Sequence, residues 1–140
     1  NHLCSIEDIN PIEGVYELIE SLYENKIKLA IASSSPIKVI ELVVKRLKAD
    51  KFFKAVVQGD DVLRSKPEPD IFLYAAQKLN ADPKECAVIE DSKNGVNGAK
   101  KAGMRAIGYL NPNSGNQDLS NADLIIKSFK NIEIGKILGE

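Results

Sequence analysis

The stretch Cys86–Met104, CAVIEDSKNGVNGAKKAGM, decides the fold expected for this chain. It opens with apolar residues 87–89, a pattern typical of a short buried strand, and two carboxylates follow at once, Glu90 and Asp91. A turn of small residues then leads into a helical segment that closes at Gly103. An α/β protein binds ligands just outside the carboxyl ends of its parallel strands. Two adjacent acids at that place predict Mg²⁺, which takes oxygen ligands, commonly one or two carboxylates plus a substrate phosphate.

Strand and helix patterns alternate along the rest of the sequence. Short apolar runs predict further strands at 28–32, 55–57, 105–109 and 124–126. Apolar residues at helical spacing predict helices over 11–24, 36–47, 70–79 and 131–139, the first three capped by Asn10, Ser35 and Asp70. This alternation predicts an α/β fold: a doubly wound, Rossmann-like, mostly parallel sheet with helices on both faces.

Composition narrows the possible functions. The chain has 140 residues, 44% of them hydrophobic and 28% charged, with a net charge of −1. Length favours one domain, and the charge balance gives no attraction to nucleic acid or to a membrane surface. The two cysteines, Cys4 and Cys86, form no zinc-binding cluster, and we expect a cytoplasmic, reducing compartment. The single histidine, His2, offers no basis for histidine catalysis.

Two further segments carry groups suited to phosphate chemistry. Ser33 stands where the strand at 28–32 breaks into a helix, and the amides of Ser34 and Ser35 would lie near that helix N-terminus, where phosphate oxygens bind well. The alternative is that these serines only cap the helix. Lys66 sits in the stiff segment Lys66–Asp70, KPEPD, and could set its charge against a phosphoryl group or a carboxylate. The alternative is a solvated surface lysine.

The acid pair also has two interpretations. Glu90 and Asp91 are sequence neighbours, and neighbours in a strand point to opposite faces. Both can reach one ion only if the chain has left strand geometry, which Ser92, Asn94 and Gly95 make plausible. Otherwise they are two solvated acids in a loop. All of these groups follow strands of one parallel sheet, so they can meet at its carboxyl edge.

Taken together, the motifs resemble the haloacid dehalogenase superfamily, in its branch of β-phosphoglucomutase and sugar-phosphate phosphatases. The resemblance covers about 12–128 and rests on three segments in order, which are IKLAIASSSP at 27–36, SKPEPDIFLYAAQKL at 65–79 and CAVIEDSKNGVNGAKKAGMRAIGY at 86–109. It implies a three-layer α/β/α core and a small phosphorylated substrate.

The resemblance also implies a role for each matching residue. Ser33 would hydrogen-bond the transferring phosphoryl group, and Lys66 would neutralise charge between that group and the nucleophile. Asp91 would be a Mg²⁺ ligand, with Glu90 either a second ligand or an organiser of the ion's waters. Such groups stabilise negative charge during transfer.

The first motif of the superfamily, Asp-x-Asp-x-Thr after a strand, is absent from the sequence, as is the helical cap. The resemblance therefore implies that residues 1–10 are a connector returning from a cap and that 11–140 form a partial core lacking its first central strand. An open position beside the strand at 28–32 would expose backbone groups. We expect an N-terminal segment, from the same gene or a second chain, to fill it.

The sequence thus favours the C-terminal core of a Mg²⁺-dependent phosphatase that acts on a small phosphorylated metabolite, a sugar phosphate, through an aspartyl-phosphate whose nucleophile lies outside this chain. A β-phosphoglucomutase is the alternative within the same family. A non-catalytic phosphate-binding, metal-binding or regulatory fragment is the alternative from another class, and the chain alone is expected to be inactive.

Overall fold

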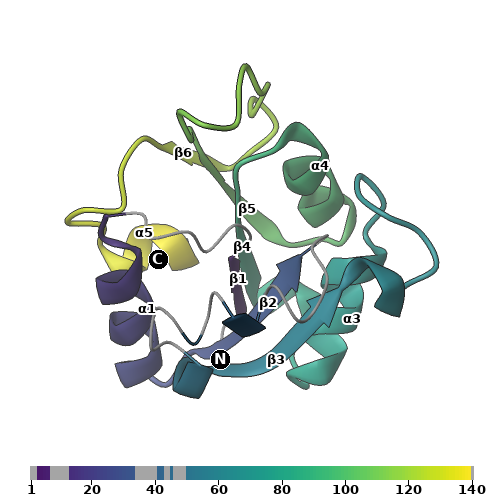
Figure 1. The fold of residues 1–140 in the computed structure, drawn as a ribbon, viewed down its shortest axis with the longest axis horizontal. Helices are drawn as coiled ribbons and strands as arrows, with labels where there is room; N and C mark the ends of the chain where they lie inside the picture. The colour runs from purple at the N-terminus through teal and green to yellow at the C-terminus, as the bar shows by residue number, and fades with distance from the viewer. Residues whose placement is uncertain (1–2, 7–12, 34–40, 43–44, 46–49, 140) are drawn as a thin grey trace.

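The computed structural model describes residues 3–6, 13–33, 41–42, 45 and 50–139. These residues form one parallel sheet with the strand order β3-β2-β1-β4-β5-β6, layered between helices (Figure 1). The strands are β1 (Leu3–Ile6), β2 (Lys28–Ser33), β3 (Phe53–Gln58), β4 (Cys86–Glu90), β5 (Arg105–Tyr109) and β6 (Leu124–Ile126). The predicted doubly wound α/β fold is confirmed.

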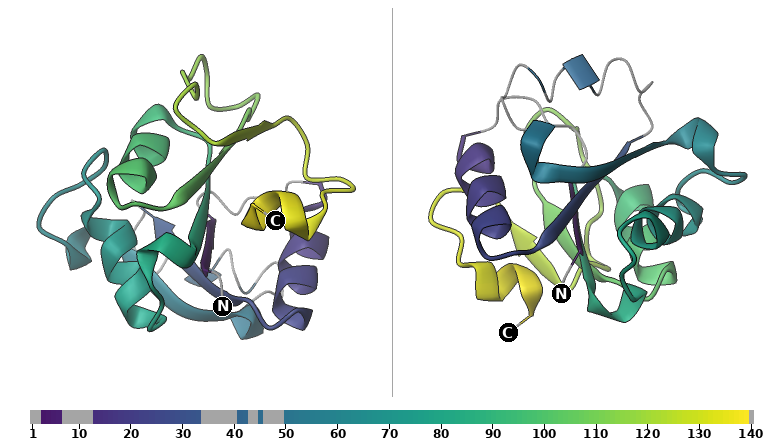
Figure 2. Two further views of the ribbon diagram at one scale, coloured as in Figure 1. Left: turned by 180° about the vertical axis from the view of Figure 1, so that it is seen from behind. Right: turned by 90° about the horizontal axis from the view of Figure 1, so that it is seen from below.

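Helices cover both faces of this sheet. Helices α1 (Val15–Glu24) and α5 (Ile134–Leu138) lie on one face, and α3 (Asp70–Lys78) and α4 (Lys93–Lys101) lie on the other, as the views in Figure 2 agree. Single 3-10 turns stand at Asp50–Phe52, Gly59–Asp61 and Pro83–Glu85. Each face buries its own apolar cluster, with Ile19 and Leu22 of α1 on the first and Phe72 of α3 and Val96 of α4 on the second.

The centre of the sheet corrects one expectation. Leu3–Ile6, predicted to lie in a connector, forms β1 and pairs in parallel with both β2 and β4. The strands β2 and β4 are therefore separated by one strand position, as predicted, but the chain's own residues occupy that position. The physical reason is that two facing strand edges carry unpaired backbone groups, which an extended segment can satisfy. The pairing with β2 extends only over Lys28–Ala30.

The first helix starts later than expected. It begins at Val15, with Gly14 as its N-cap at φ 91°, whereas the expected cap Asn10 lies outside the described residues. A side chain at Gly14 would also collide with the backbone of Phe129, since a Cβ atom there would lie 2.7 Å from the Phe129 carbonyl carbon. The last residue of α1, Glu24, matches the predicted end of this helix.

Two other predicted helices differ in part. Of the segment 36–47, only 41, 42 and 45 are described, and all three are helical, while its expected cap Ser35 lies outside the description. Asp70 is the first residue of α3, whose N-cap is Pro69, so the prediction that Asp70 caps this helix is wrong. No helix within the described ranges is long and apolar enough to cross a bilayer.

Candidate functional site

The candidate site lies at the carboxyl edge of the sheet, where β2 and β4 end. Ser33 is the last residue of β2 and Glu90 the last residue of β4. Because all strands are parallel, these ends share one edge. Ser33 is 5% exposed and Glu90 is 2% exposed, so both polar side chains are held inside the protein. The predicted phosphate-binding residues Ser34 and Ser35 lie outside the described residues.

A buried ion pair joins the lysine loop to the end of β4. The Lys66 Nζ donates to Glu90 Oε2 at 2.7 Å, and the two side chains are 7% and 1% exposed. The same Nζ lies 3.5 Å from the carbonyl oxygen of Ala32, the neighbour of Ser33. It also stands 5.0 Å from the ring centre of Phe72. The structure thereby brings together three groups that are far apart in the sequence.

Residues of the β4–α4 turn hold Glu90 in its buried position. Ser92 is the N-cap of α4, where its hydroxyl accepts from the Gly95 amide at 3.0 Å and donates to Glu90 Oε1 at 3.3 Å. Gly95 leaves the space that the Glu90 side chain fills, because a Cβ atom there would overlap its carboxyl group. The positive end of the α4 dipole also favours a carboxylate at this place.

The second acid of the pair faces a different part of the molecule. Asp91 is 8% exposed and its Oδ2 accepts two hydrogen bonds, from Ser114 Oγ at 2.6 Å and from Asn111 Nδ2 at 3.0 Å. Both donors belong to the segment that follows β5. The chain has left strand geometry after Glu90, as the sequence suggested, but the two carboxylates then bond to different elements.

The acidic side chains of the site can be compared with the ligands that the expected Mg²⁺ needs. Among the described residues, no group of three or more acidic, histidine or cysteine side chains is arranged to hold a metal ion. Mg²⁺ keeps several waters and is often held by only one or two carboxylates plus substrate phosphate. Asp91, at the end of β4 with a firmly oriented carboxylate, fits such a sparse site. The Glu90 carboxylate is engaged by Lys66 and Ser92, which suits an organiser of the site better than a direct ligand.

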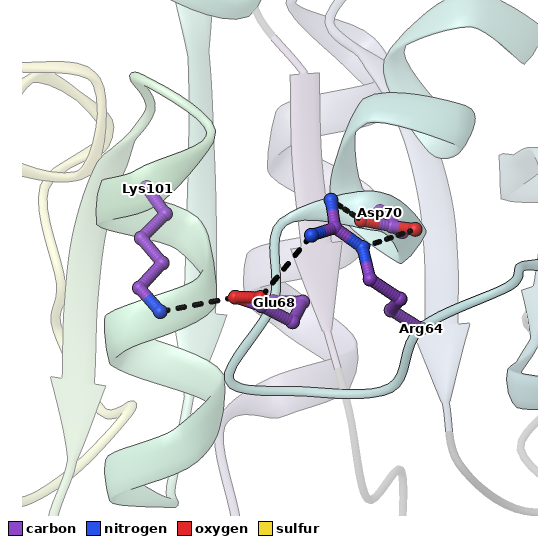
Figure 3. A network of polar contacts seen from close by, with 4 residues as sticks. All are labelled: Arg64, Glu68, Asp70 and Lys101. Carbon is purple, nitrogen blue, oxygen red and sulfur yellow. Dashed lines mark hydrogen bonds and ion pairs between the residues drawn. The ribbon is translucent and has the colours of Figure 1, made fainter.

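Three ion pairs at the surface brace the lysine loop from outside (Figure 3). Arg64 donates to Asp70 at 2.9 Å and to Glu68 at 3.4 Å, and Glu68 also pairs with Lys101 of α4 at 3.1 Å. The hydrogen bond from Arg64 lowers the pKa of Asp70, and the same bond and charge raise the pKa of Arg64. These contacts flank Lys66 on both sides and link its loop to α3 and α4.

Sequence reasoning missed the partners of Asp91. Asn111 and Ser114 lie between the strands predicted at 105–109 and 124–126, in a segment to which no role was assigned. One signal could have found them: this polar segment directly follows β5, which is the neighbour of β4, so it starts at the same edge as Asp91. The pairing of Lys66 with Glu90 in particular was also missed, although a carboxylate had been considered as one partner for this lysine.

Several known proteins are similar to this chain in sequence. A family model described as haloacid dehalogenase-like hydrolase matches residues 1–109. A phosphorylated carbohydrates phosphatase of Thermotoga maritima is 42% identical over 94 residues, which are 67% of this chain and 44% of that protein. The β-phosphoglucomutase of Bacillus subtilis is 34% identical over 128 residues, 91% of this chain and 53% of that protein.

Solved structures of related proteins have the same fold as this chain. A β-phosphoglucomutase structure from Clostridium difficile superposes with a TM-score of 0.79 at 28% identity, covering 90% of this chain and 54% of that one. A putative β-phosphoglucomutase from Thermotoga maritima gives 0.75 at 37% identity, covering 86% and 56%. The chain thus spans about half the length of the relatives described here. On these matches and on its fold, the chain belongs to the haloacid dehalogenase-like hydrolase family.

Proposed function

We propose that this chain is the core of a Mg²⁺-dependent phosphatase that acts on a small phosphorylated metabolite, of the sugar-phosphate class. The observation that carries the proposal is the buried pair of Lys66 and Glu90 at the carboxyl edge of the sheet, with the end of β2 beside it and Asp91 next along the chain. A buried lysine next to a carboxylate-lined edge offers the fixed charge that a phosphoryl group needs.

Each residue has a definite task in this proposal. Lys66 supplies positive charge to the phosphoryl oxygens, and Glu90 holds the ammonium group in place. Ser33 hydrogen-bonds the phosphoryl group from the end of β2. Ser34 and Ser35, which follow it in the sequence, would add further phosphate contacts. Asp91 would hold Mg²⁺, which when bound neutralises charge on phosphate oxygens.

The covalent chemistry needs a group from outside these residues. In the proposed reaction an aspartate oxygen attacks phosphorus, the bond from phosphorus to the substrate oxygen breaks, and that oxygen takes up a proton. Water then attacks the aspartyl-phosphate, which releases inorganic phosphate and restores the aspartate. The attacking aspartate would come from a further segment, and the 140-residue chain alone would then show no turnover.

We propose that this further segment takes the place of β1 in the whole protein. The short pairing of β1 with Lys28–Ala30 of β2 supports the idea, as does the coverage of only about half of each relative. Hydrogen exchange tests it in the 140-residue chain and in the protein expressed from its complete reading frame. Amides of Leu3–Ile6 should be protected in the former and exchange quickly in the latter. Equal protection in both would overturn the exchange of strands.

A mutase is the second candidate, because β-phosphoglucomutases are among the relatives that cover most of the chain. A mutase would return the phosphoryl group to another hydroxyl of the sugar instead of to water. Product analysis distinguishes the two: release of inorganic phosphate supports the phosphatase, and an isomeric sugar phosphate supports the mutase.

The test of the proposed function uses the protein expressed from its complete reading frame. Release of phosphate from a panel of sugar phosphates is measured with and without Mg²⁺. We expect activity that needs Mg²⁺ and is lost in Asp91→Asn, while the exposed Asp118→Asn variant keeps it. Loss of activity in both variants alike, or none in wild type against any substrate, would contradict the proposal.

A non-catalytic binding or regulatory role is the alternative from another class. The reading frame upstream of Asn1 helps to separate the two, because an Asp-x-Asp-x-Thr motif there favours an enzyme and its absence favours a binding role or a split gene whose second chain completes the site. The expected compartment is the reducing cytoplasm, which suits a chain whose Cys86 side chain is buried in the core.

A further inference from the structure

The segment after β5 carries a feature that the proposed function does not use. Within the described residues, the recorded hydrogen bonds to the Asp91 carboxylate both end on its Oδ2, one from Ser114 and one from Asn111. A carboxylate oxygen offers about two lone-pair sites, so these two donors occupy Oδ2. Coordination of a cation by Asp91 is thereby directed to Oδ1.

The two donors are themselves held in fixed orientations. The Asn111 Oδ1 accepts from the Asn113 amide at 3.0 Å, so its Nδ2 is turned toward Asp91. The Ser114 amide donates to the Asn111 carbonyl at 3.1 Å, which closes a turn between the two residues. The donors form one unit, in which a change at either residue reaches the carboxylate directly.

A glutamine ties this unit to the helix that follows Asp91. The Gln117 Nε2 donates to the Ser114 carbonyl at 3.1 Å, and its Oε1 accepts from the amide of Lys93, the first residue of α4, at 3.0 Å. The donors and the acid are therefore braced against the same element. Rotation of the carboxylate would break two hydrogen bonds within a braced structure.

The geometry points to Asn111 and Ser114 as positioning residues that hold Asp91 as a single-oxygen ligand and so favour Mg²⁺ over Ca²⁺. Mg²⁺ demands near-ideal octahedral geometry at short range, whereas Ca²⁺ takes more oxygens at longer range and accepts carboxylates through both oxygens. Blocking Oδ2 removes the two-oxygen mode that suits Ca²⁺ and leaves the one-oxygen mode that suits Mg²⁺. This inference rests on the proposed role of Asp91 as the metal ligand.

The test measures metal binding directly and needs no enzymatic activity. The isotope-labelled protein expressed from its complete reading frame is titrated with Mg²⁺ and, separately, with Ca²⁺, and dissociation constants are taken from the backbone amide shifts of Asp91, Asn111 and 113–117. Ser114→Ala should lower the ratio of the Ca²⁺ to the Mg²⁺ dissociation constant by about threefold to tenfold, the equivalent of one hydrogen bond.

Three further variants make the result specific. Ser114→Thr keeps the hydroxyl and should retain the wild-type ratio, which a purely structural role of Ser114 would not require. Asn111→Ala should act in the same direction as Ser114→Ala, and the dispersion of its spectrum shows whether it is folded. Ser120→Ala is the matched control on the same segment, because the backbone amide of Ser120 donates to Asp118, whereas the donors to Asp91 are Ser114 and Asn111.

The outcomes separate this inference from the proposed function. Mg²⁺ binding at Asp91 with an unchanged ratio in folded Ser114→Ala and Asn111→Ala overturns the inference and leaves the metal site standing. No shift of the Asp91 amide with either ion overturns both the metal site and the inference. A lowered ratio in both variants, with wild-type ratios in Ser114→Thr and Ser120→Ala, supports the inference.

Discussion

The lysine loop makes two kinds of ion pair within a few residues. Lys66 pairs with Glu90 at 2.7 Å, with side chains 7% and 1% exposed. Arg64 pairs with Asp70 at 2.9 Å, with side chains 58% and 19% exposed. The distances are nearly equal, so the difference between the pairs lies in the solvent around them. The inner pair holds the charge of Lys66 where little solvent reaches it. The outer pairs brace the loop that carries this lysine.

The two kinds of pair differ in what the loss of one partner costs in stability. A buried pair contributes little net stability, because desolvation offsets attraction, yet removing one partner is costly since the other charge stays buried. An exposed pair can lose a partner cheaply because water replaces it. We therefore expect the inner pair to be maintained for the proposed phosphoryl chemistry and the outer contacts to act as dispensable support.

The largest expected effect comes from breaking the inner pair. Lys66→Met should lower the free energy of unfolding by about 3–5 kcal/mol, because Glu90 would be left buried without this partner. Lys101→Met, at an exposed lysine that pairs with Glu68, is the matched control and should cost about 1 kcal/mol or less. Urea denaturation of both measures the difference.

The double variant Lys66→Met with Glu90→Gln sharpens this result. It should recover part of the lost stability, because no buried charge remains from the pair. If Lys66→Met costs no more than Lys101→Met, the contrast between the two kinds of pair is wrong.

A smaller effect is expected from crowding the inner pair. Gly95→Ala puts a methyl group where the Glu90 carboxyl lies, and we expect a loss of about 1–3 kcal/mol, typical of overpacking. The neighbouring exposed position offers a control, since Asn94→Ala should raise stability by about 0.5 kcal/mol through helix propensity. Thermal or urea unfolding checks both, and a stabilising Gly95→Ala would show that Glu90 can move aside freely.

The outer contacts should respond to salt. Glu68→Gln removes two exposed pairs and should cost about 1 kcal/mol or less at low salt. That cost should shrink toward zero at about 1 M salt, where the Debye length is about 3 Å. The cost of Lys66→Met should change little, because buried pairs are screened less. Equal salt dependence of the two would remove the distinction between them.

The smallest effect concerns acid. The hydrogen bond from Arg64 lowers the pKa of Asp70 from its usual 3.8. A lowered pKa in the folded state means that the pair stabilises the fold above about pH 3.8 and that this contribution is lost as the pH falls through the folded-state value. The stability difference between wild type and Asp70→Asn should therefore fade on acidification. A difference that stays constant from neutral to strongly acidic pH would contradict this.

Local pattern predicted most of the fold. Arg105–Tyr109 and Leu124–Ile126 were predicted as strands with the bounds that the structure gives them, and the strand predicted from residues 87–89 is Cys86–Glu90. Their apolar runs are short and bounded by turn residues, so the pattern is unambiguous. The position of Leu3–Ile6 could not be predicted this way, because four mixed residues have no clear period. Only the demand of the neighbouring strand edges makes them a strand.

The candidate site was also predictable only in part. Ser33, Lys66, Glu90 and Asp91 were predicted because each follows a strand or lies in a stiff motif. Their pairings were not predictable, since strand order fixes only that the groups share an edge. Whether Glu90 faces Lys66 or a metal depends on side-chain packing around Gly95, which the sequence does not reveal. Asn111 and Ser114 were missed because loop conformation decides their contacts.

The most direct test of the central claim is a crystal structure of the protein from its complete reading frame, grown with Mg²⁺ and aluminium fluoride as a phosphoryl mimic. We expect Mg²⁺ at about 2.0–2.1 Å from one oxygen of Asp91. We also expect the mimic to lie within hydrogen-bond distance of Lys66, with Glu90 still paired to that lysine. Metal and mimic bound away from Asp91 and Lys66, or absent from this edge of the sheet, would contradict it.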